Sequence, residues 1–237
     1  MRPSATYNPQ TTNVEQMFND IAPHYDFLNH FLSGGTDKRW RRKAINLLKK
    51  YNPQTILDVA TGTGDFAIAA LKLNPQKITG IDISGEMLKI AEKKIQQKKV
   101  QDKIFLTSGS SENLPFPDLS FDAVTVAFGV RNFKNLKKGI IEMHRVLNRK
   151  GVAVILEFSK PYVFPMKQVY FFYFRRILPW VGKIVSKNPN AYAYLPETVM
   201  KFPQGDEFAE IITNSGFGKV RIYILSGGIC SIYLAEK

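Results

Sequence analysis

The sequence predicts an α/β fold with a mainly parallel β-sheet. Between residues 55 and 158, apolar runs of strand length alternate with amphipathic segments of helix length. That alternation is typical of a parallel sheet that carries helices on both faces. The chain then ends differently, because two strand-like runs flank the turn Ser226-Gly227-Gly228, which indicates an antiparallel hairpin. We therefore expect a seven-stranded sheet that ends in that hairpin.

A helical region comes first, over residues 13–50, with a break at Ser33-Gly34-Gly35, and residues 1–12 have the composition of a disordered segment. The parallel strands are predicted at residues 55–60, 77–83, 104–107, 122–128 and 152–158. Helices are predicted at residues 65–73, 85–97, 136–146 and 206–214, and the hairpin strands at residues 220–225 and 229–234.

Residues 161–203 form an insert that is dense in aromatic and basic side chains, among them Lys160 at its edge, Lys167, Arg175 and Arg176. We expect a helical cap whose aromatic residues pack on one another, a lid over an apolar substrate that meets lipid head groups, or both. No repeat or second boundary is visible. Residues 1–237 are therefore predicted to form one domain, with its core at residues 55–160 and 204–237.

The composition indicates a globular protein of a reducing compartment. Hydrophobic residues make up 44% of the 237 residues, enough to bury a core, and the single cysteine excludes an internal disulfide or a cysteine zinc cluster. The N-terminus has no apolar stretch of the kind a signal peptide needs, and no run approaches the roughly 18 residues of a membrane span. We expect a cytoplasmic protein, soluble or peripheral on the inner face of the membrane.

The net charge of +13 favours an anionic partner, either nucleic acid or a membrane surface. Five lysines share the segment 85–99, and we interpret them as one solvated helix face: Lys89, Lys93, Lys94, Lys98 and Lys99. A second basic group, Arg39, Arg41, Arg42 and Lys43, flanks Trp40 and indicates a surface that contacts a partner.

A nucleoside site is predicted where the first strand ends. Gly62 and Gly64 supply a tight turn before a helix, and Asp82 closes the next strand 20 residues after Gly62 (82 − 62), where an acidic residue can accept ribose hydroxyls. Asp65 would place a carboxylate beside a dinucleotide pyrophosphate, which is electrostatically unfavourable. S-adenosylmethionine fits better, because its sulfonium and α-ammonium can face carboxylates. The alternative is a plain turn whose acidic residue favours the helix dipole.

These features together give the outline of a class I, Rossmann-like methyltransferase. Several segments are also similar to signatures of the ubiquinone/menaquinone biosynthesis C-methyltransferases, from about residue 15 to the end of the chain. The segments that carry this resemblance are residues 25–29, 32–33, 40–41, 114–118, 120–122, 128–132, 145–147, 156–161, 194–195 and 216–217.

The chain departs from the family's pattern at three places. Asp37 stands where the family usually has a histidine, so a proton-shuttling role of that position is in doubt. Residues 148–151 replace a Lys-Pro-Gly-Gly turn, and Thr61 replaces the first glycine of the loop. None of these changes removes an obvious catalytic group.

The resemblance implies S-adenosylmethionine as co-substrate, no metal, and cofactor contacts at the glycine loop and at the ends of the strands. Thr63 and the loop amides would hold the amino-acid end, Asp82 the ribose, and Ser110 with Ser111 the adenine, while Ala127 or Phe128 would wall the site. The full set of expected cofactor residues is Asp58, Gly62, Thr63, Gly64, Asp65, Asp82, Ile83, Ser110, Ser111 and Ala127.

The implied reaction is methylation of a ring carbon of a reduced prenylated quinone. The substrate would be demethylmenaquinol, or alternatively a 2-methoxy-6-polyprenyl-1,4-benzoquinol. Arg131 is the first candidate to stabilise the phenolate, and its structural alternative is an ion pair with Asp82 or Asp122. Weaker candidates for handling the phenolic proton are His24, Tyr25, Asp26 and Glu157.

Two other functions are weighed against this one. A nucleic-acid methyltransferase would suit the charge, but residues 127–130 lack the Asn/Asp-Pro-Pro-aromatic motif of amino-nitrogen methylation, and Cys230 lies in the terminal hairpin rather than at a site suited to a pyrimidine nucleophile. A non-catalytic binding subunit would not need the intact glycine loop. We expect no nucleic-acid partner, a transient anionic membrane surface, and a homodimer.

Overall fold

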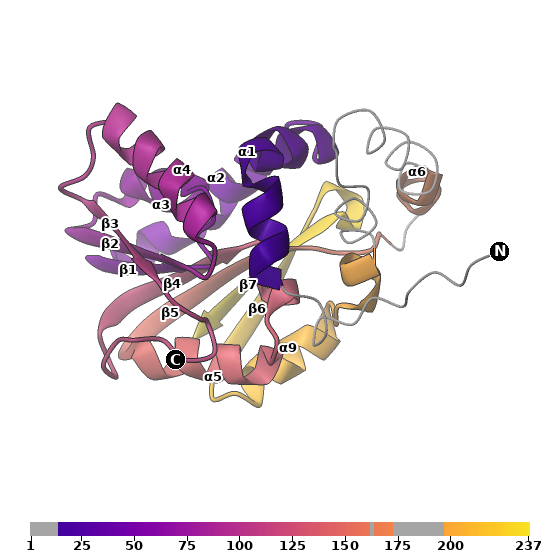
Figure 1. Cartoon of the computed structure of the whole chain (residues 1–237). Helices are drawn as coiled ribbons and strands as arrows, with labels where there is room; N and C mark the ends of the chain where they lie inside the picture. Colours follow the sequence, from indigo (N-terminus) through magenta and orange to yellow (C-terminus); the bar gives the residue numbers. More distant parts are fainter. Residues whose placement is uncertain (1–13, 162–163, 173–196) are drawn as a thin grey trace.

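The computed structural model describes residues 14–161, 164–172 and 197–237, and a seven-stranded sheet lies at its centre (Figure 1). The strands are β1 (Thr55–Val59), β2 (Lys77–Asp82), β3 (Ile104–Ser108), β4 (Phe121–Ala127), β5 (Leu147–Phe158), β6 (Lys219–Leu225) and β7 (Cys230–Glu236). The described helices are α1 (Val14–Leu32), α2 (Asp37–Leu48), α3 (Asp65–Ala70), α4 (Gly85–Gln97), α5 (Leu136–Val146), α6 (Met166–Phe172) and α9 (Asp206–Thr213).

The strand order is β3-β2-β1-β4-β5-β7-β6. Strands β1 to β5 pair parallel to one another, whereas β7 is antiparallel to both β5 and β6. The predicted mainly parallel sheet with a terminal hairpin is therefore confirmed. The chain crosses from one half of the sheet to the other between β1 and β4, and ligands of open α/β sheets bind at such a switch point.

Two element boundaries differ from the prediction by more than two residues. β5 begins at Leu147 rather than at residue 152, because Leu147 pairs with Phe121 before a shift in register. The polar residues that follow Leu147 are typical of a loop, so the sequence pattern did not indicate a strand there. The helix predicted at residues 65–73 is α-helical only to Ala70, and a 3-10 turn (Leu71–Leu73) follows. Asn74 then adopts a left-handed conformation, which ends the helix.

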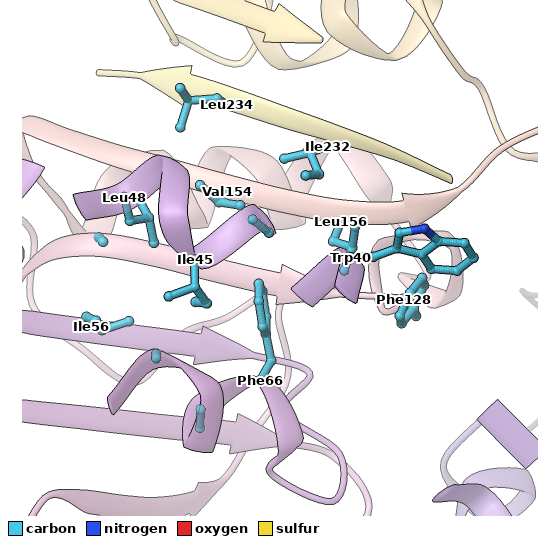
Figure 2. Packing of buried hydrophobic residues seen from close by; sticks show 14 of the residues in the cluster. Trp40, Ile45, Leu48, Ile56, Phe66, Phe128, Val154, Leu156, Ile232 and Leu234 are labelled. Atoms are coloured by element: carbon cyan, nitrogen blue, oxygen red, sulfur yellow. The ribbon is translucent and has the colours of Figure 1, made fainter. Parts of the chain in front are cut away.

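Helices lie on both faces of the sheet (Figure 1), and two clusters of buried apolar side chains pack between the helices and the strands. On one face Trp40, Ile45 and Leu48 of α2 pack against β5 and β7, with Phe66 of α3 and Phe128 beside them (Figure 2). On the other face α5 and α9 contribute a second cluster, to which Ile140 and Phe208 belong. Because both layers are fully packed, the carboxyl edge of the sheet is held rigidly.

Helix α1 lies against α4 and borders the carboxyl edge of β1 and β2. Asn19 accepts a hydrogen bond from the Ser84 hydroxyl at 2.7 Å, and Ser84 caps α4 by accepting from the Met87 amide. The N-terminal helical region predicted from sequence thus forms two helices, α1 and α2. None of the helices in the described part of the chain has the length and apolar content that a membrane crossing needs.

Only part of the predicted insert is described, namely residue 161, residues 164–172 and residues 197–203. It contains α6, and the prediction of a lid stays a prediction. Arg175 and Arg176 lie outside the described residues, as does the predicted disordered segment at residues 1–12.

Candidate active site

A cavity of about 290 Å³ lies at the carboxyl ends of β1, β2 and β4. Phe18 and Tyr25 of α1 form one wall, and Phe128 and Phe133 form another. Seven of the residues expected from sequence border it: Tyr25, Gly62, Asp82, Ile83, Ser110, Ser111 and Phe128. The switch point of the sheet therefore carries a pocket, as expected for this strand order.

Asp82 is oriented by the backbone around it. Its carboxylate accepts hydrogen bonds from the amides of Gly62 (2.8 Å) and Ser84 (2.9 Å). Burial raises the pKa of the Asp82 carboxyl above its ordinary value, and these amides oppose the shift by stabilising the charged form. A carboxylate offers about four acceptor positions, so Asp82 can still accept further hydrogen bonds from a ligand in the cavity.

Ser110 and Ser111 border the same cavity beyond β3. The Ser110 hydroxyl donates to the Glu112 carboxylate, and the Glu112 amide donates back to that hydroxyl at 3.2 Å. This local turn fixes the loop at the border of the cavity.

A second, smaller pocket of about 20 Å³ adjoins the first and shares Tyr25, Ala60 and Gly62 with it. It is bordered by four further residues that the sequence placed in the cofactor site: Asp58, Thr63, Asp65 and Ala127. The expected cofactor residues thus fall into two groups, and the Tyr25 side chain borders both pockets.

Gly64 borders neither of these pockets. It is the N-cap of α3 with φ +81°, and a Cβ atom there would lie 3.2 Å from the Cβ of Ala91 in α4. Its glycine is therefore explained by the left-handed backbone and by the close approach of α3 to α4. Gly62, with φ +55°, is needed for the turn itself.

Two non-glycine residues at the ends of β1 and β4 are also left-handed, Ala60 (φ 52°) and Phe128 (φ 59°), and both border the large cavity. Such conformations cost about 1–3 kcal/mol for non-glycine residues and cluster at functional sites.

Asp58 is buried beneath the small pocket. Its carboxylate accepts hydrogen bonds from the hydroxyls of Thr61 and Thr125, each at 2.6 Å. Burial raises the pKa of Asp58 to about 6, although these hydroxyls and the charge of Arg41 favour the ionised form. A carboxyl with this pKa is mostly ionised at neutral pH, so Asp58 can face a cation.

Lys94 is not part of a solvated lysine face, and that prediction was wrong for this residue. Lys89, Lys93, Lys98 and Lys99 are exposed, but the Lys94 side chain is only 22% exposed. Its ammonium lies 2.6 Å from Asp26 of α1 and 2.7 Å from Asp65 of α3, and it donates to the Thr63 hydroxyl at 3.0 Å. The hydrophobic periodicity of α4 could not show this, because the partners come from two other helices.

The partner surface predicted around Trp40 was wrong for two of its five members. Trp40 and Arg41 are buried, whereas Arg39, Arg42 and Lys43 are exposed. Trp40 donates its indole N–H to Ser226 at 2.9 Å and packs edge-on against Phe158. These two residues therefore belong to the interior of the protein.

Arg131 is also buried, and neither alternative partner considered from sequence is the one it contacts. Its guanidinium lies 2.7 Å from the Glu157 carboxylate and 5.5 Å from the centre of the Phe158 ring. Asp122 instead accepts hydrogen bonds from the amides of Gln54 and Thr55, beside the opposite end of the sheet.

Burial raises the pKa of Glu157, while the charge of Arg131 favours its ionised form. Arg131 does not border either of these two pockets. Of the other catalytic candidates, Tyr25 borders both, and the side chain of His24 lies outside the described residues.

Several bordering residues were not singled out from sequence. Asn132, Phe133 and Lys134 follow β4, and Met87 comes from the first turn of α4. Residues 132–134 could have been found, because the carboxyl end of a central parallel strand is the expected ligand edge. Among the described residues, no group of three or more His, Cys, Asp or Glu side chains could hold a metal ion.

Comparison with known proteins gives a consistent result. The model of the ubiE/COQ5 methyltransferase family matches residues 6–237. The chain is 47% identical to a demethylmenaquinone methyltransferase of Bacteroides fragilis, covering 100% of this chain and 97% of that protein. It is 45% identical to a demethylmenaquinone methyltransferase of Porphyromonas gingivalis, covering 99% and 97% of the two chains. It is also 43% identical to the ubiquinone/menaquinone biosynthesis C-methyltransferase UbiE of Geotalea uraniireducens, covering 94% and 96%.

The solved structures that resemble this one share its fold. A methyltransferase-like structure from Methanococcus maripaludis, described as S-adenosylmethionine-dependent, superposes with a TM-score of 0.67 at 18% identity, covering 99% and 97% of the two chains. The [4+2]-cyclase SpnF superposes with a TM-score of 0.69 at 16% identity, covering 98% and 97%. Since a cyclase has this fold too, the architecture alone does not decide the reaction.

Proposed function

Because this chain belongs to the ubiE/COQ5 methyltransferase family, we propose that it transfers a methyl group from S-adenosylmethionine to a ring carbon of a reduced prenylated quinone. The observation that carries the choice of substrate is the similarity, along nearly the whole chain, to two proteins named demethylmenaquinone methyltransferase. Demethylmenaquinol is therefore the first candidate. A 2-methoxy-6-polyprenyl-1,4-benzoquinol is the second, because other relatives carry names that include ubiquinone biosynthesis.

The two adjoining pockets have the chemistry that S-adenosylmethionine requires. Asp82 would accept the ribose hydroxyls, with Ile83, Ser110 and Ser111 around the adenine. Asp58 and Asp65 border the smaller pocket, where they would face the cationic groups of the amino-acid end. The co-substrate supplies a methyl group that its sulfonium already activates, so much of the protein's task is to position the two reactants.

The quinol ring must be electron-rich at the attacked carbon, which requires loss of a phenolic proton. For the stabilisation of the resulting phenolate we propose Arg131, at the carboxyl edge of β4, because a fixed guanidinium stabilises developing negative charge. Since Arg131 borders neither pocket, the quinol ring would bind beside them, within reach of this guanidinium. Glu157 holds that guanidinium in place at 2.7 Å. Tyr25 and His24, both in α1, are the candidates for handling the proton.

The part of the insert that is described suits contact with a lipid surface. Phe164 is 76% exposed and Phe172 is 62% exposed, and both lie close in sequence to the exposed Lys167. Exposed aromatic side chains beside lysines are typical of protein segments that dock on anionic membranes. The prenylated substrate of the proposed reaction would be held in such a membrane.

The experiment is methyl transfer from radiolabelled S-adenosylmethionine to dithionite-reduced demethylmenaquinone, with the benzoquinol and unmodified DNA and RNA as parallel substrates. We expect label in menaquinone. Label in the benzoquinol product alone would move the assignment to ubiquinone biosynthesis, and label in nucleic acid would contradict the proposal. Binding of the co-substrate without turnover of either quinol would indicate a non-catalytic subunit.

A further inference from the structure

Arg41 has a buried, positively charged group whose hydrogen bonds are not all used. The residue is 7% exposed and its guanidinium lies 5.4 Å from the centre of the Phe128 ring. Its Nη1 donates to Asp37, but its Nε has no acceptor within the described residues. A guanidinium keeps its charge in proteins, and leaving a buried donor of this kind unmatched costs about 1–3 kcal/mol.

Arg41 also borders the smaller pocket, together with Asp58, Asp65 and Thr63. It is the cationic residue among the residues that border this pocket in the described part of the chain, and the two aspartates are the anionic ones. The pocket therefore presents one positive group and two carboxylates, of which Asp65 is also paired with the Lys94 ammonium at 2.7 Å. This charge pattern complements a ligand group that carries a carboxylate and a nearby ammonium, as the amino-acid end of S-adenosylmethionine does.

We propose that Arg41 binds the α-carboxylate of S-adenosylmethionine through its Nε side. The α-ammonium then faces Asp58 and the Asp65 carboxylate that Lys94 also contacts. This inference rests on the proposed function. The larger and the smaller pocket share Tyr25, Ala60 and Gly62, so the amino-acid end reaches Arg41 past the Tyr25 ring when the nucleoside lies at Asp82.

Asp37 is then the positioning residue of Arg41. It is buried, it accepts hydrogen bonds from Arg41 and from the Ser33 hydroxyl at 3.0 Å, and its carboxylate lies 2.9 Å from Nδ1 of His30. The charge of Arg41 helps to hold the pKa of Asp37 below its ordinary value, against the effect of burial. Asp37 thus orients the guanidinium of Arg41.

The test compares S-adenosylmethionine with decarboxylated S-adenosylmethionine, which lacks only the α-carboxylate. Both are titrated by calorimetry into the full-length wild-type protein, Arg41→Gln, Arg41→Lys and the matched control Arg42→Gln, which alters an exposed neighbour. We expect the wild-type preference for S-adenosylmethionine to fall at least tenfold in Arg41→Gln through loss of affinity for S-adenosylmethionine alone. Arg41→Lys should retain part of the preference, and Arg42→Gln all of it.

Equal weakening of both ligands in Arg41→Gln would overturn the proposal, because it would show that Arg41 supports the fold and not the carboxylate. If Arg41→Gln does not fold, Asp37→Asn provides the same comparison, because it keeps the shape of the positioning residue. It should also reduce the preference for S-adenosylmethionine over the decarboxylated ligand. An unchanged preference in Asp37→Asn would contradict the proposal. If the wild-type protein bound neither ligand, the proposed function itself would be contradicted, a result distinct from equal weakening.

Discussion

The ammonium of Lys94 in α4 lies 2.6 Å from the carboxylate of Asp26 in α1. The same ammonium contacts Asp65 at 2.7 Å, and Asp26 accepts a hydrogen bond from the Thr63 hydroxyl at 2.6 Å. One lysine therefore joins the helix that borders both pockets to the loop that is proposed to hold the cofactor. Because these side chains are only partly exposed, solvent screens the contacts less than it screens surface ion pairs.

The first prediction is that Lys94→Met raises KM for S-adenosylmethionine about three- to tenfold and changes kcat less than twofold. Loss of the ammonium leaves Asp26 and Asp65 to repel each other, so α1 should dock less tightly over the cofactor. The measurement is steady-state methyl transfer at varied co-substrate. Lys93→Met, an exposed neighbour on the same helix, should behave as wild type; an equal effect of both variants would mean that general charge, and not this contact, is responsible.

The second prediction is that Asp82→Ala lowers the affinity for S-adenosylmethionine at least tenfold while the protein stays folded. Two charge-assisted hydrogen bonds to the ribose, each contributing about 1.5–3 kcal/mol, would be lost. The dissociation constant is measured by calorimetry and folding by thermal unfolding. Asp102→Ala, at an exposed position, is the control. An unchanged dissociation constant in Asp82→Ala would remove Asp82 from the ribose site.

The third prediction concerns pH. The pKa of Asp58 is about 6 in the folded protein against an ordinary 3.8, so between these values the folded protein holds a proton that the unfolded chain has lost. The contribution of Asp58 to the free energy of unfolding should therefore fall as pH rises from about 4 to about 6 and then level off. The Asp58→Asn variant has no carboxyl to titrate at this position. Its free energy of unfolding relative to the wild type should therefore rise by about 2 kcal/mol between pH 4 and pH 7.

This difference is measured by chemical denaturation of both proteins at each pH, and the exposed Asp102→Asn should show no such trend. The raised pKa of Asp82 acts in the same direction, but it is present in both proteins and cancels in the comparison. A constant stability difference between Asp58→Asn and wild type across the range would contradict the assignment to Asp58.

The fourth prediction is that Arg131→Ala lowers kcat for methylation of reduced demethylmenaquinone by about 10²–10³ while S-adenosylmethionine still binds. Arg131→Lys should recover only part of the rate, because an ammonium lacks the planar, delocalised charge of the guanidinium that Glu157 holds. Glu157→Gln, which keeps the shape but not the charge of the partner, should have a smaller effect. Wild-type turnover in Arg131→Ala would exclude the role, and lost cofactor binding would make Arg131 a structural residue and favour Tyr25.

The fifth prediction is that the protein floats with vesicles that contain anionic lipid at low salt and is released at high salt. Each lysine near such a surface contributes about 1 kcal/mol. A Phe164→Ser/Lys167→Glu double variant should bind the vesicles more weakly than the wild type. The control Ile224→Ser, which replaces an exposed apolar residue in β6, should bind them as the wild type does. Absence of flotation by the wild type would mean that the substrate arrives by another route.

The architecture could be predicted because its signals are local. The spacing of apolar residues within each segment predicts whether that segment is a strand or a helix. The glycine loop and Asp82 likewise indicate the ligand-binding edge of the sheet without any knowledge of the packing. The predicted start of β5 was wrong because it depends on a non-local contact: Leu147 is a strand residue only through its pairing with Phe121.

The sequence by itself thus determined the α/β class and the terminal hairpin. It also determined nine of the ten expected cofactor residues that border the two pockets, all except Gly64. Only the tertiary structure decided which charges meet. Lys94 appeared solvated and proved to bridge Asp26 and Asp65, and Arg41 appeared to lie on a surface and proved to be buried beside Asp58. The periodicity of one helix reports its own buried face, but an ion pair depends on where a second and a third helix place their side chains, and that follows only from packing.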